Sequence, residues 1–122
     1  MKLSQDTYVD EAEKIMRSLC AEKKVVTTSQ IRNILALISD IYNQILNDSS
    51  ENLSNEIKGR IEYLRVRCAY EAGRSGEVKR FIEKSKLMEY LRQINGKRSN
   101  FLLFHHYVEA LVAYHRFYDG RD

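Results

Sequence analysis

The residues best suited to acid–base chemistry in this 122-residue sequence are gathered near residue 105. All three histidines lie within residues 105–115, and Glu109 follows His105 by four positions. On a helix these two side chains face each other across one turn, so they could form a general acid–base pair. The alternative is two polar residues on a buried helix that satisfy one another. We favour this alternative, because a histidine–glutamate pair without a nucleophile, metal or cleft specifies no reaction.

The two cysteines are the other candidates for a nucleophile. Cys68 is in register with Ile57, Ile61 and Leu64 on the apolar stripe of a predicted helix, where cysteine normally behaves as a small hydrophobic residue. Cys20 also lies in a helical pattern, and neither position indicates the electropositive, exposed surroundings that activate a thiol. The sequence contains no CxxC pair, HExxH motif or glycine-rich phosphate loop. It therefore predicts a protein that is not an enzyme and that needs no cofactor or metal.

Positive charge is concentrated in the middle of the sequence. Residues 54–98 contain twelve Lys/Arg and six Asp/Glu residues, a local net charge of +6, whereas the whole chain carries only +3. The remaining residues are therefore net negative. A basic middle within an otherwise acidic chain indicates a surface for a polyanion such as a nucleic acid.

Within this segment, basic residues recur every seven positions, which aligns them in two rows along a helix. Arginines at this spacing can reach successive phosphates, and neighbouring tyrosines can stack on bases or sugars. The alternative is a solvated face on which glutamates pair with the basic residues, but the excess of positive charge favours nucleic acid. The first row is Arg60, Arg67 and Arg74, flanked by Tyr63 and Tyr70, and the second row is Lys58 and Arg65.

A weaker candidate lies on the preceding predicted helix. Arg32, Ser39 and Asn43 share its polar side and could form a second phosphate-binding edge. An ordinary polar surface explains the same residues, and from their pattern alone we favour that interpretation.

The elements that would position these residues are all helical. Apolar residues recur at three- and four-residue spacing, and the chain has no proline and only five glycines. We therefore expect an all-α fold, a compact single-domain bundle of about five helices over residues 1–122. Ser29 and Ser54 are predicted N-caps, and Gly73 is a predicted helix end. The predicted helices cover about 7–19, 29–47, 54–72, 77–94 and 100–118.

The last predicted helix is apolar nearly all round, which is typical of a helix that is central in a bundle or covered by a partner subunit. No apolar run in the sequence is long enough to cross a membrane, and the first residues do not resemble a signal peptide. We therefore expect no membrane contact, a cytoplasmic location and reduced cysteines.

Four strings, in this order, carry a family resemblance that covers nearly the whole chain. They are TTSQIRNILALISDIYNQIL (27–46), YLRVRCAYEAGR (63–74), KLMEYLRQI (86–94) and FHHYVEALVAYHRFYDGRD (104–122). The chain resembles the small subunit of type III-A CRISPR effector complexes, the Csm complexes. It is a pattern of several segments and not a short catalytic motif.

The resemblance implies a non-catalytic helical subunit that stacks in several copies along the channel for guide RNA and target RNA. It implies contacts with the repeated backbone subunit, the large subunit and further copies of itself, and a role in steadying or monitoring the guide–target duplex. An alternative is a helical protein–protein adapter or scaffold subunit that touches no RNA. The basic residues that match the family's RNA-contacting helix faces are Arg32, Lys58, Arg60, Arg65 and Arg67.

Overall fold

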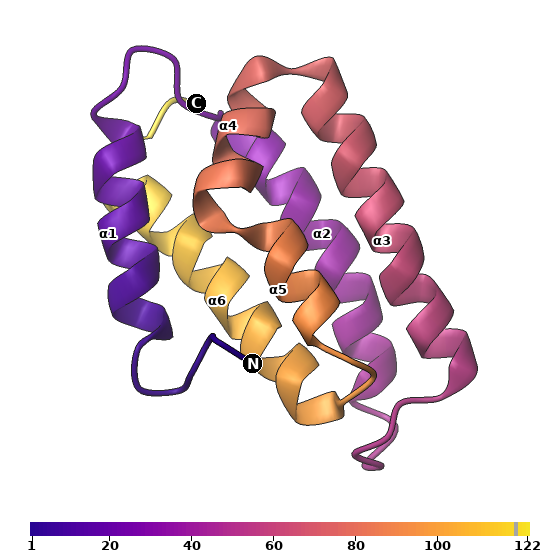
Figure 1. Ribbon diagram of the computed structural model, residues 1–122. Coiled ribbons are helices and arrows are strands. Elements are labelled where there is room, and N and C mark those ends of the chain that lie inside the picture. The colour runs from indigo at the N-terminus through magenta and orange to yellow at the C-terminus, as the bar shows by residue number, and fades with distance from the viewer. Residues whose placement is uncertain (119) are drawn as a thin grey trace.

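The computed structural model describes residues 1–118 and 120–122. Over these residues the fold is all-α, as predicted, with six helices and no β-strand. None of these helices is long and apolar enough to cross a membrane. Figure 1 shows the helices packed side by side as a bundle. They are α1 Tyr8–Cys20, α2 Thr28–Ile45, α3 Asn55–Arg74, α4 Gly76–Ser85, α5 Leu87–Gln93 and α6 Arg98–Phe117.

The segment predicted as one helix over residues 77–94 is two helices, α4 and α5, so the prediction of about five helices is one short. Lys86 separates them in the left-handed conformation, with a φ of 60°. This conformation costs a residue other than glycine about 1–2 kcal/mol. The break turns α5 so that Leu87 and Leu91 are buried. No glycine or proline marks the position, so the sequence pattern could not reveal it.

The helix ends agree with the prediction in one case and differ in two. Ser54 caps α3 as predicted, since its hydroxyl accepts a hydrogen bond from the backbone N–H of Ile57. The cap of α2 is Thr27 and not Ser29, because Gln30 lies three residues after Thr27 and completes a reciprocal capping box. Helix α3 also continues through Gly73 to Arg74, and the next helix is capped by Ser75.

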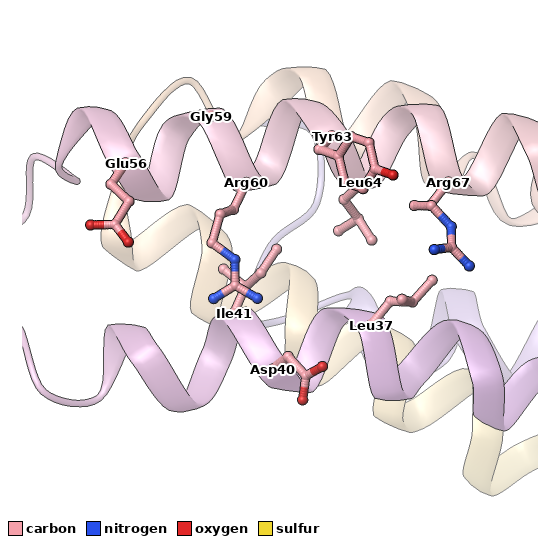
Figure 2. Close-up of a pocket in the computed structure, with 9 residues that line it drawn as sticks. All are labelled: Leu37, Asp40, Ile41, Glu56, Gly59, Arg60, Tyr63, Leu64 and Arg67. Carbon is pink, nitrogen blue, oxygen red and sulfur yellow. The ribbon is translucent and has the colours of Figure 1, made fainter.

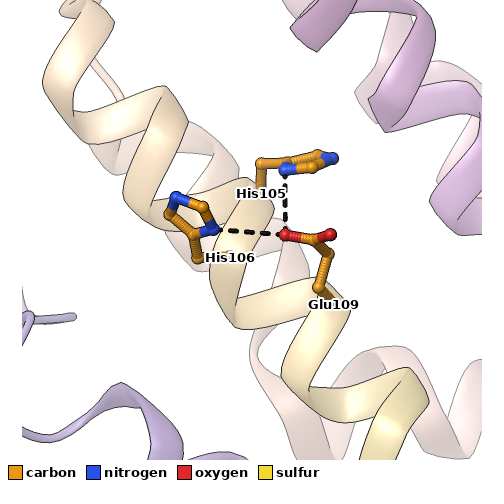
Figure 3. Close-up of side chains that lie close together, drawn as sticks. All are labelled: His105, His106 and Glu109. Carbon is orange, nitrogen blue, oxygen red and sulfur yellow. Dashed lines mark hydrogen bonds and ion pairs between the residues drawn. The ribbon is translucent and has the colours of Figure 1, made fainter.

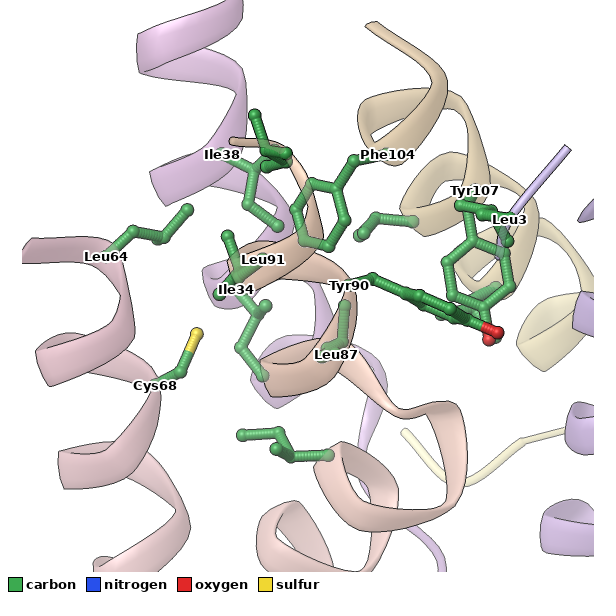
Figure 4. Close-up of a cluster of buried hydrophobic side chains, with 14 of the residues drawn as sticks. Leu3, Ile34, Ile38, Leu64, Cys68, Leu87, Tyr90, Leu91, Phe104 and Tyr107 are labelled. Carbon is green, nitrogen blue, oxygen red and sulfur yellow. The ribbon is translucent and has the colours of Figure 1, made fainter. Parts of the chain in front are cut away.

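Helix α6 lies at the centre of the bundle, where it packs against α1, α2 and α5 (Figure 1). This is the first of the two arrangements expected for its apolar sequence. Figure 4 shows Phe104 and Tyr107 of this helix among buried residues of the neighbouring helices. The rings of Tyr107 and Tyr90 meet edge to face, with centroids 5.3 Å apart. The fully buried residues of α6 include Phe101, Phe104, Tyr107, Val108 and Leu111.

Helix α3 lies at the edge of the bundle (Figure 1) and packs against α2, α4 and α5. Its inner side is the predicted stripe of Ile57, Ile61, Leu64 and Cys68, all buried. Its outer side is left uncovered by the described chain. The exposed large residues on that side are Tyr63, Val66 and Tyr70, with exposed fractions of 60%, 58% and 59%.

We predict that Leu64→Ala and Leu111→Ala each destabilise the protein by about 2–5 kcal/mol, because truncating a buried leucine removes apolar contact and leaves a cavity. The two side chains are only 3% and 0% exposed. The matched control is Val66→Ala on the outer side of α3, which should change stability little. Urea unfolding followed by circular dichroism measures all three. Equal midpoints for Leu64→Ala and Val66→Ala would contradict the placement of α3.

Candidate nucleic-acid interface

A groove runs between α2 and α3, and we call it the α2–α3 groove. It encloses about 370 Å³ and is lined by nine residues from the two helices (Figure 2). Leu37, Ile41 and Leu64 supply apolar side chains, while Arg60 and Arg67 extend from α3 towards α2. The seven-residue spacing predicted that these two arginines share one side of the helix, and the structure confirms it. The remaining lining residues are Asp40, Glu56, Gly59 and Tyr63.

The arginines of the α2–α3 groove are only weakly paired with acids. A guanidinium nitrogen of Arg60 donates a hydrogen bond to the side-chain oxygen of Gln44, which is uncharged. Arg67 lies 3.8 Å from Glu71, and Glu71 also lies 3.7 Å from Arg74. The single carboxylate of Glu71 is therefore shared by Arg67 and Arg74, and both contacts are long. Arg67 and Arg74 keep 41% and 63% of their side-chain surface exposed, so water screens these contacts.

The charge of the groove itself is balanced, because Asp40 and Glu56 line it together with the two arginines. Helix α3 as a whole has five basic and three acidic residues. The other seven basic residues of the segment 54–98 follow at positions 79–98, on or beside α4, α5 and the start of α6. The local charge of +6 is therefore spread over several helices and is not a property of α3 alone.

Aromatic side chains continue the groove onto the outer side of α3. Tyr63 lines the groove and is 60% exposed, and Tyr70 lies two turns further along the helix. The guanidinium carbon of Arg74 is 5.5 Å from the centre of the Tyr70 ring, which is a cation–π contact. Arginine and tyrosine therefore alternate along this flank, as the sequence predicted, and both are open to a ligand.

The second predicted row faces the other way. Lys58 lines a separate hollow of about 260 Å³ with Arg92, Asn95 and Gly96, on the α5 side of α3. Gly96 has a φ of +69°, and a Cβ there would come within 2.8 Å of the Lys58 side chain. Arg65 lies 2.9 Å from Glu62 and is 34% exposed. Arg65 is thus more closely paired with an acid than Arg60 or Arg67, whereas Lys58 is exposed on the α5 side of the helix.

Arg32 is separated from both rows. It is exposed on the α6 side of α2, in a hollow that it lines with Thr28, Val112, His115 and Arg116. The sequence could place Arg32 on a polar helix face but could not say which neighbouring helix that face meets. Of the five predicted RNA contacts, the structure therefore brings only Arg60 and Arg67 together.

The histidine–glutamate pair is close but not as expected. The Nδ1 of His105 is 3.3 Å from a Glu109 carboxylate oxygen (Figure 3), yet this buried nitrogen has no hydrogen-bond partner. Glu109 instead hydrogen-bonds to His106, at 3.1 Å. His105 is held by α2, because its ring stacks on Tyr42 with centroids 3.9 Å apart. Burial lowers the pKa of His105, which favours the neutral imidazole. The two residues therefore do not satisfy one another.

Cys68 has the surroundings of a core residue. It is 1% exposed, and burial raises the pKa of its thiol to about 11, with the Glu71 carboxylate adding to the effect. A nucleophilic cysteine needs the opposite shift. The prediction that Cys68 packs as a small hydrophobic residue is therefore confirmed.

An all-helical bundle whose edge helix exposes arginines and tyrosines is typical of a subunit that binds a partner. The family model described as Csm2 Type III-A matches residues 2–121. The chain belongs to this family, the small subunit of type III-A CRISPR complexes, and the resemblance seen in the sequence is thereby confirmed.

Relatives from three organisms carry the name CRISPR system Cms protein Csm2. The protein of Mycobacterium tuberculosis is 36% identical over 124 residues, with 100% of this chain and 99% of the relative covered. That of Streptococcus thermophilus is 41% identical over 123 residues, with 98% of both covered. That of Enterococcus italicus is 43% identical over 100 residues, with 80% and 71% covered.

We predict that Cys68 does not react with a thiol reagent at pH 8 in the native protein. With a pKa of about 11, roughly one thiol in a thousand is ionised at that pH, and the side chain is also buried. The experiment uses Cys20→Ser, in which Cys68 is the remaining cysteine, and follows Ellman's reagent with and without urea. One equivalent should react in urea and almost none without it. Rapid reaction of the folded variant would show that the thiol is accessible.

Proposed function

We propose that this chain is a non-catalytic subunit of a type III-A CRISPR effector complex that lines the channel for guide RNA and target RNA. In this proposal residues 1–122 act as one helical domain, and several copies stack beside the repeated backbone subunit and the large subunit. The copies contact the RNA backbone and help to stabilise or monitor guide–target pairing in antiviral defence. RNA partners of this kind also imply a cytoplasmic location.

The observation that carries the RNA part of the proposal is the flank of α3 that borders the α2–α3 groove. Arg60 and Arg67 lie two turns apart there, with one bonded to an uncharged partner and the other weakly paired. Tyr63 and Tyr70 accompany them and are more than half exposed. Guanidinium groups suit phosphates and exposed tyrosines suit base or sugar stacking. The flank therefore supports contact with a nucleic-acid strand.

Backbone contacts fit a subunit that must accept any guide sequence. Phosphate contacts set position and orientation but carry no sequence information. In RNA-guided complexes, base pairing reads the sequence and the protein recognises the backbone and shape of the duplex. We place the five basic residues in this role, with Arg60 and Arg67 as the principal contacts. The others are Arg32, Lys58 and Arg65.

A second candidate function is favoured by one observation, the apolar character of the outermost part of α3. Val66 lies between the two exposed tyrosines and is itself 58% exposed. Tyrosine is enriched at the centre of protein interfaces, and arginines often surround them. In this alternative the chain is an adapter between protein subunits and touches no RNA.

We predict that the purified chain has no nuclease activity, with or without divalent metal ions. Among the described residues neither the buried thiol of Cys68 nor the pair of His105 and Glu109 has the geometry of a catalytic group. The assay uses labelled single-stranded RNA with Mg²⁺ or Mn²⁺. Cleavage that persists through purification and is lost in Glu109→Gln would contradict a non-catalytic role.

We further predict that Arg60→Ala and Arg67→Ala each weaken target-RNA binding by complexes reconstituted from Csm subunits. The loss should be similar for every RNA sequence, and the dependence of log affinity on log salt should fall by about one unit for each phosphate contact removed. Lys14→Ala is the matched control, since it removes an exposed positive charge from α1, which holds none of the proposed RNA contacts. Filter binding over a range of salt concentrations provides the measurement.

Assembly must be confirmed first by size-exclusion chromatography, because a failed complex also binds no RNA. If assembly and RNA affinity are both unchanged by Arg60→Ala and Arg67→Ala, the α2–α3 flank does not contact RNA. If assembly fails while the isolated variants remain folded, the flank is a protein interface and the adapter function is favoured.

A further inference from the structure

We propose that His105, His106 and Glu109 form a binding site for a divalent transition-metal ion of the zinc class. Each residue offers one ligand atom, and these atoms all lie within 4.8 Å of one another. All three residues are on α6 (Figure 3), whereas Arg60 and Arg67 are on α3. The proposed RNA-binding role does not use them, so the two proposals are independent.

The first observation is a buried nitrogen that makes no hydrogen bond within the described residues. His105 is 4% exposed, and its Nδ1 makes no hydrogen bond. Buried polar atoms are nearly always hydrogen-bonded, and an unsatisfied one costs about 1–3 kcal/mol. The exception calls for a physical reason, and a cation coordinated by this nitrogen supplies one.

The second observation is that the His105 ring is already held as a metal ligand would be. One face stacks on Tyr42, with 7° between the planes of the two rings. The other nitrogen, Nε2, lies 3.3 Å from the hydroxyl of Ser39. When Nε2 donates its proton to that hydroxyl, Nδ1 keeps its lone pair. Metal-bound histidines commonly donate their second N–H in this way, which fixes the tautomer and the ring.

The third observation is the spacing of the ligand atoms. One Glu109 oxygen lies 3.3 Å from the Nδ1 of His105 and 3.1 Å from the Nδ1 of His106. In a tetrahedral zinc site with bonds of about 2.0–2.1 Å, neighbouring ligand atoms are about 3.3 Å apart. The two measured distances thus match this ligand spacing. Two imidazoles and a carboxylate are also a ligand set that zinc-class ions accept.

A small movement of the exposed ligands completes the site. Figure 3 shows the Glu109 carboxylate beneath the His105 ring, which is seen edge-on, whereas an imidazole lone pair points within the ring plane. The side chains of Glu109 and His106 are 51% and 45% exposed, so both can shift towards that plane while His105 stays fixed. Three protein ligands leave a fourth position for water or for a donor from a partner.

The test is titration of the full-length chain, prepared without a histidine tag, with CoCl₂ and ZnCl₂. Calorimetry measures stoichiometry and affinity, and the visible spectrum of bound Co²⁺ reports the coordination geometry. We expect one ion per chain, and at least about tenfold weaker binding in Glu109→Gln and in His106→Gln. Glu89→Gln is the matched control, because it removes an exposed helical carboxylate that lies outside the site. It should bind the ions as the parent chain does.

Nitrogen-15 NMR of the histidine rings tests His105 without replacing a buried residue. Zinc should shift the Nδ1 resonance of His105 while its Nε2 remains protonated. The proposal is overturned if the chain shows no saturable binding, if Glu109→Gln binds as tightly as the parent chain, or if zinc leaves the Nδ1 resonance of His105 unchanged.

Discussion

The arrangement of the other helices depends on one hydrogen bond, which the buried hydroxyl of Tyr107 makes. Tyr107 is the largest fully buried side chain of the core, and a phenol hydroxyl without an acceptor would be costly there. It donates a 2.8 Å hydrogen bond to the backbone carbonyl of Ser85, the last residue of α4. This contact fixes the junction between α4 and α5 against the middle of α6. The neighbouring Tyr90 extends the link to α1 through a hydrogen bond to Glu11.

Because α6 is central in the bundle, the surface available for binding a partner lies on other helices. Helices α1, α2 and α5 cover α6, so its apolar residues are used for folding. Helix α3 contacts α2, α4 and α5 and leaves its outer side to solvent. A side of a helix that exposes two tyrosines and a valine contributes little to stability, which is consistent with a surface kept for a partner. The same packing that closes the core therefore explains why the candidate interface lies on the edge helix.

Sequence periodicity predicted the apolar stripes correctly because each depends only on the helical repeat. Leu64, Cys68 and Leu111 are buried as expected, and Arg60 and Arg67 share one flank. Periodicity did not predict the break between α4 and α5, because a tertiary contact determines it. Lys86 adopts a left-handed conformation in a stretch with no glycine or proline, where the adjoining Ser85 carbonyl meets Tyr107.

The sequence also could not predict which site residues lie together, because this depends on how the helices pack. A repeat of seven shows that residues share a side of one helix but not which helix lies opposite. The sequence predicted Arg32 and Arg60 as RNA contacts on two helices, and the structure shows that they line different hollows. Likewise, the four-residue spacing of His105 and Glu109 predicted their proximity but not the orientation of the imidazole, which stacking on Tyr42 sets.

The balanced charge of the α2–α3 groove bears on how such a subunit would hold RNA. Two arginines share the groove with Asp40 and Glu56, so one copy offers a phosphate only a small net attraction. Weak sites become effective when they are linked, because each contact after the first is made at high effective concentration. Copies stacked along one RNA would therefore bind it more tightly together than one copy does, without any new kind of contact. A weakly binding subunit would also release mismatched RNA readily, since the combined affinity falls steeply when one copy loses its contact. If the chain acts as proposed, weak contacts repeated along the channel would suit a subunit that follows guide–target pairing better than one strong site would.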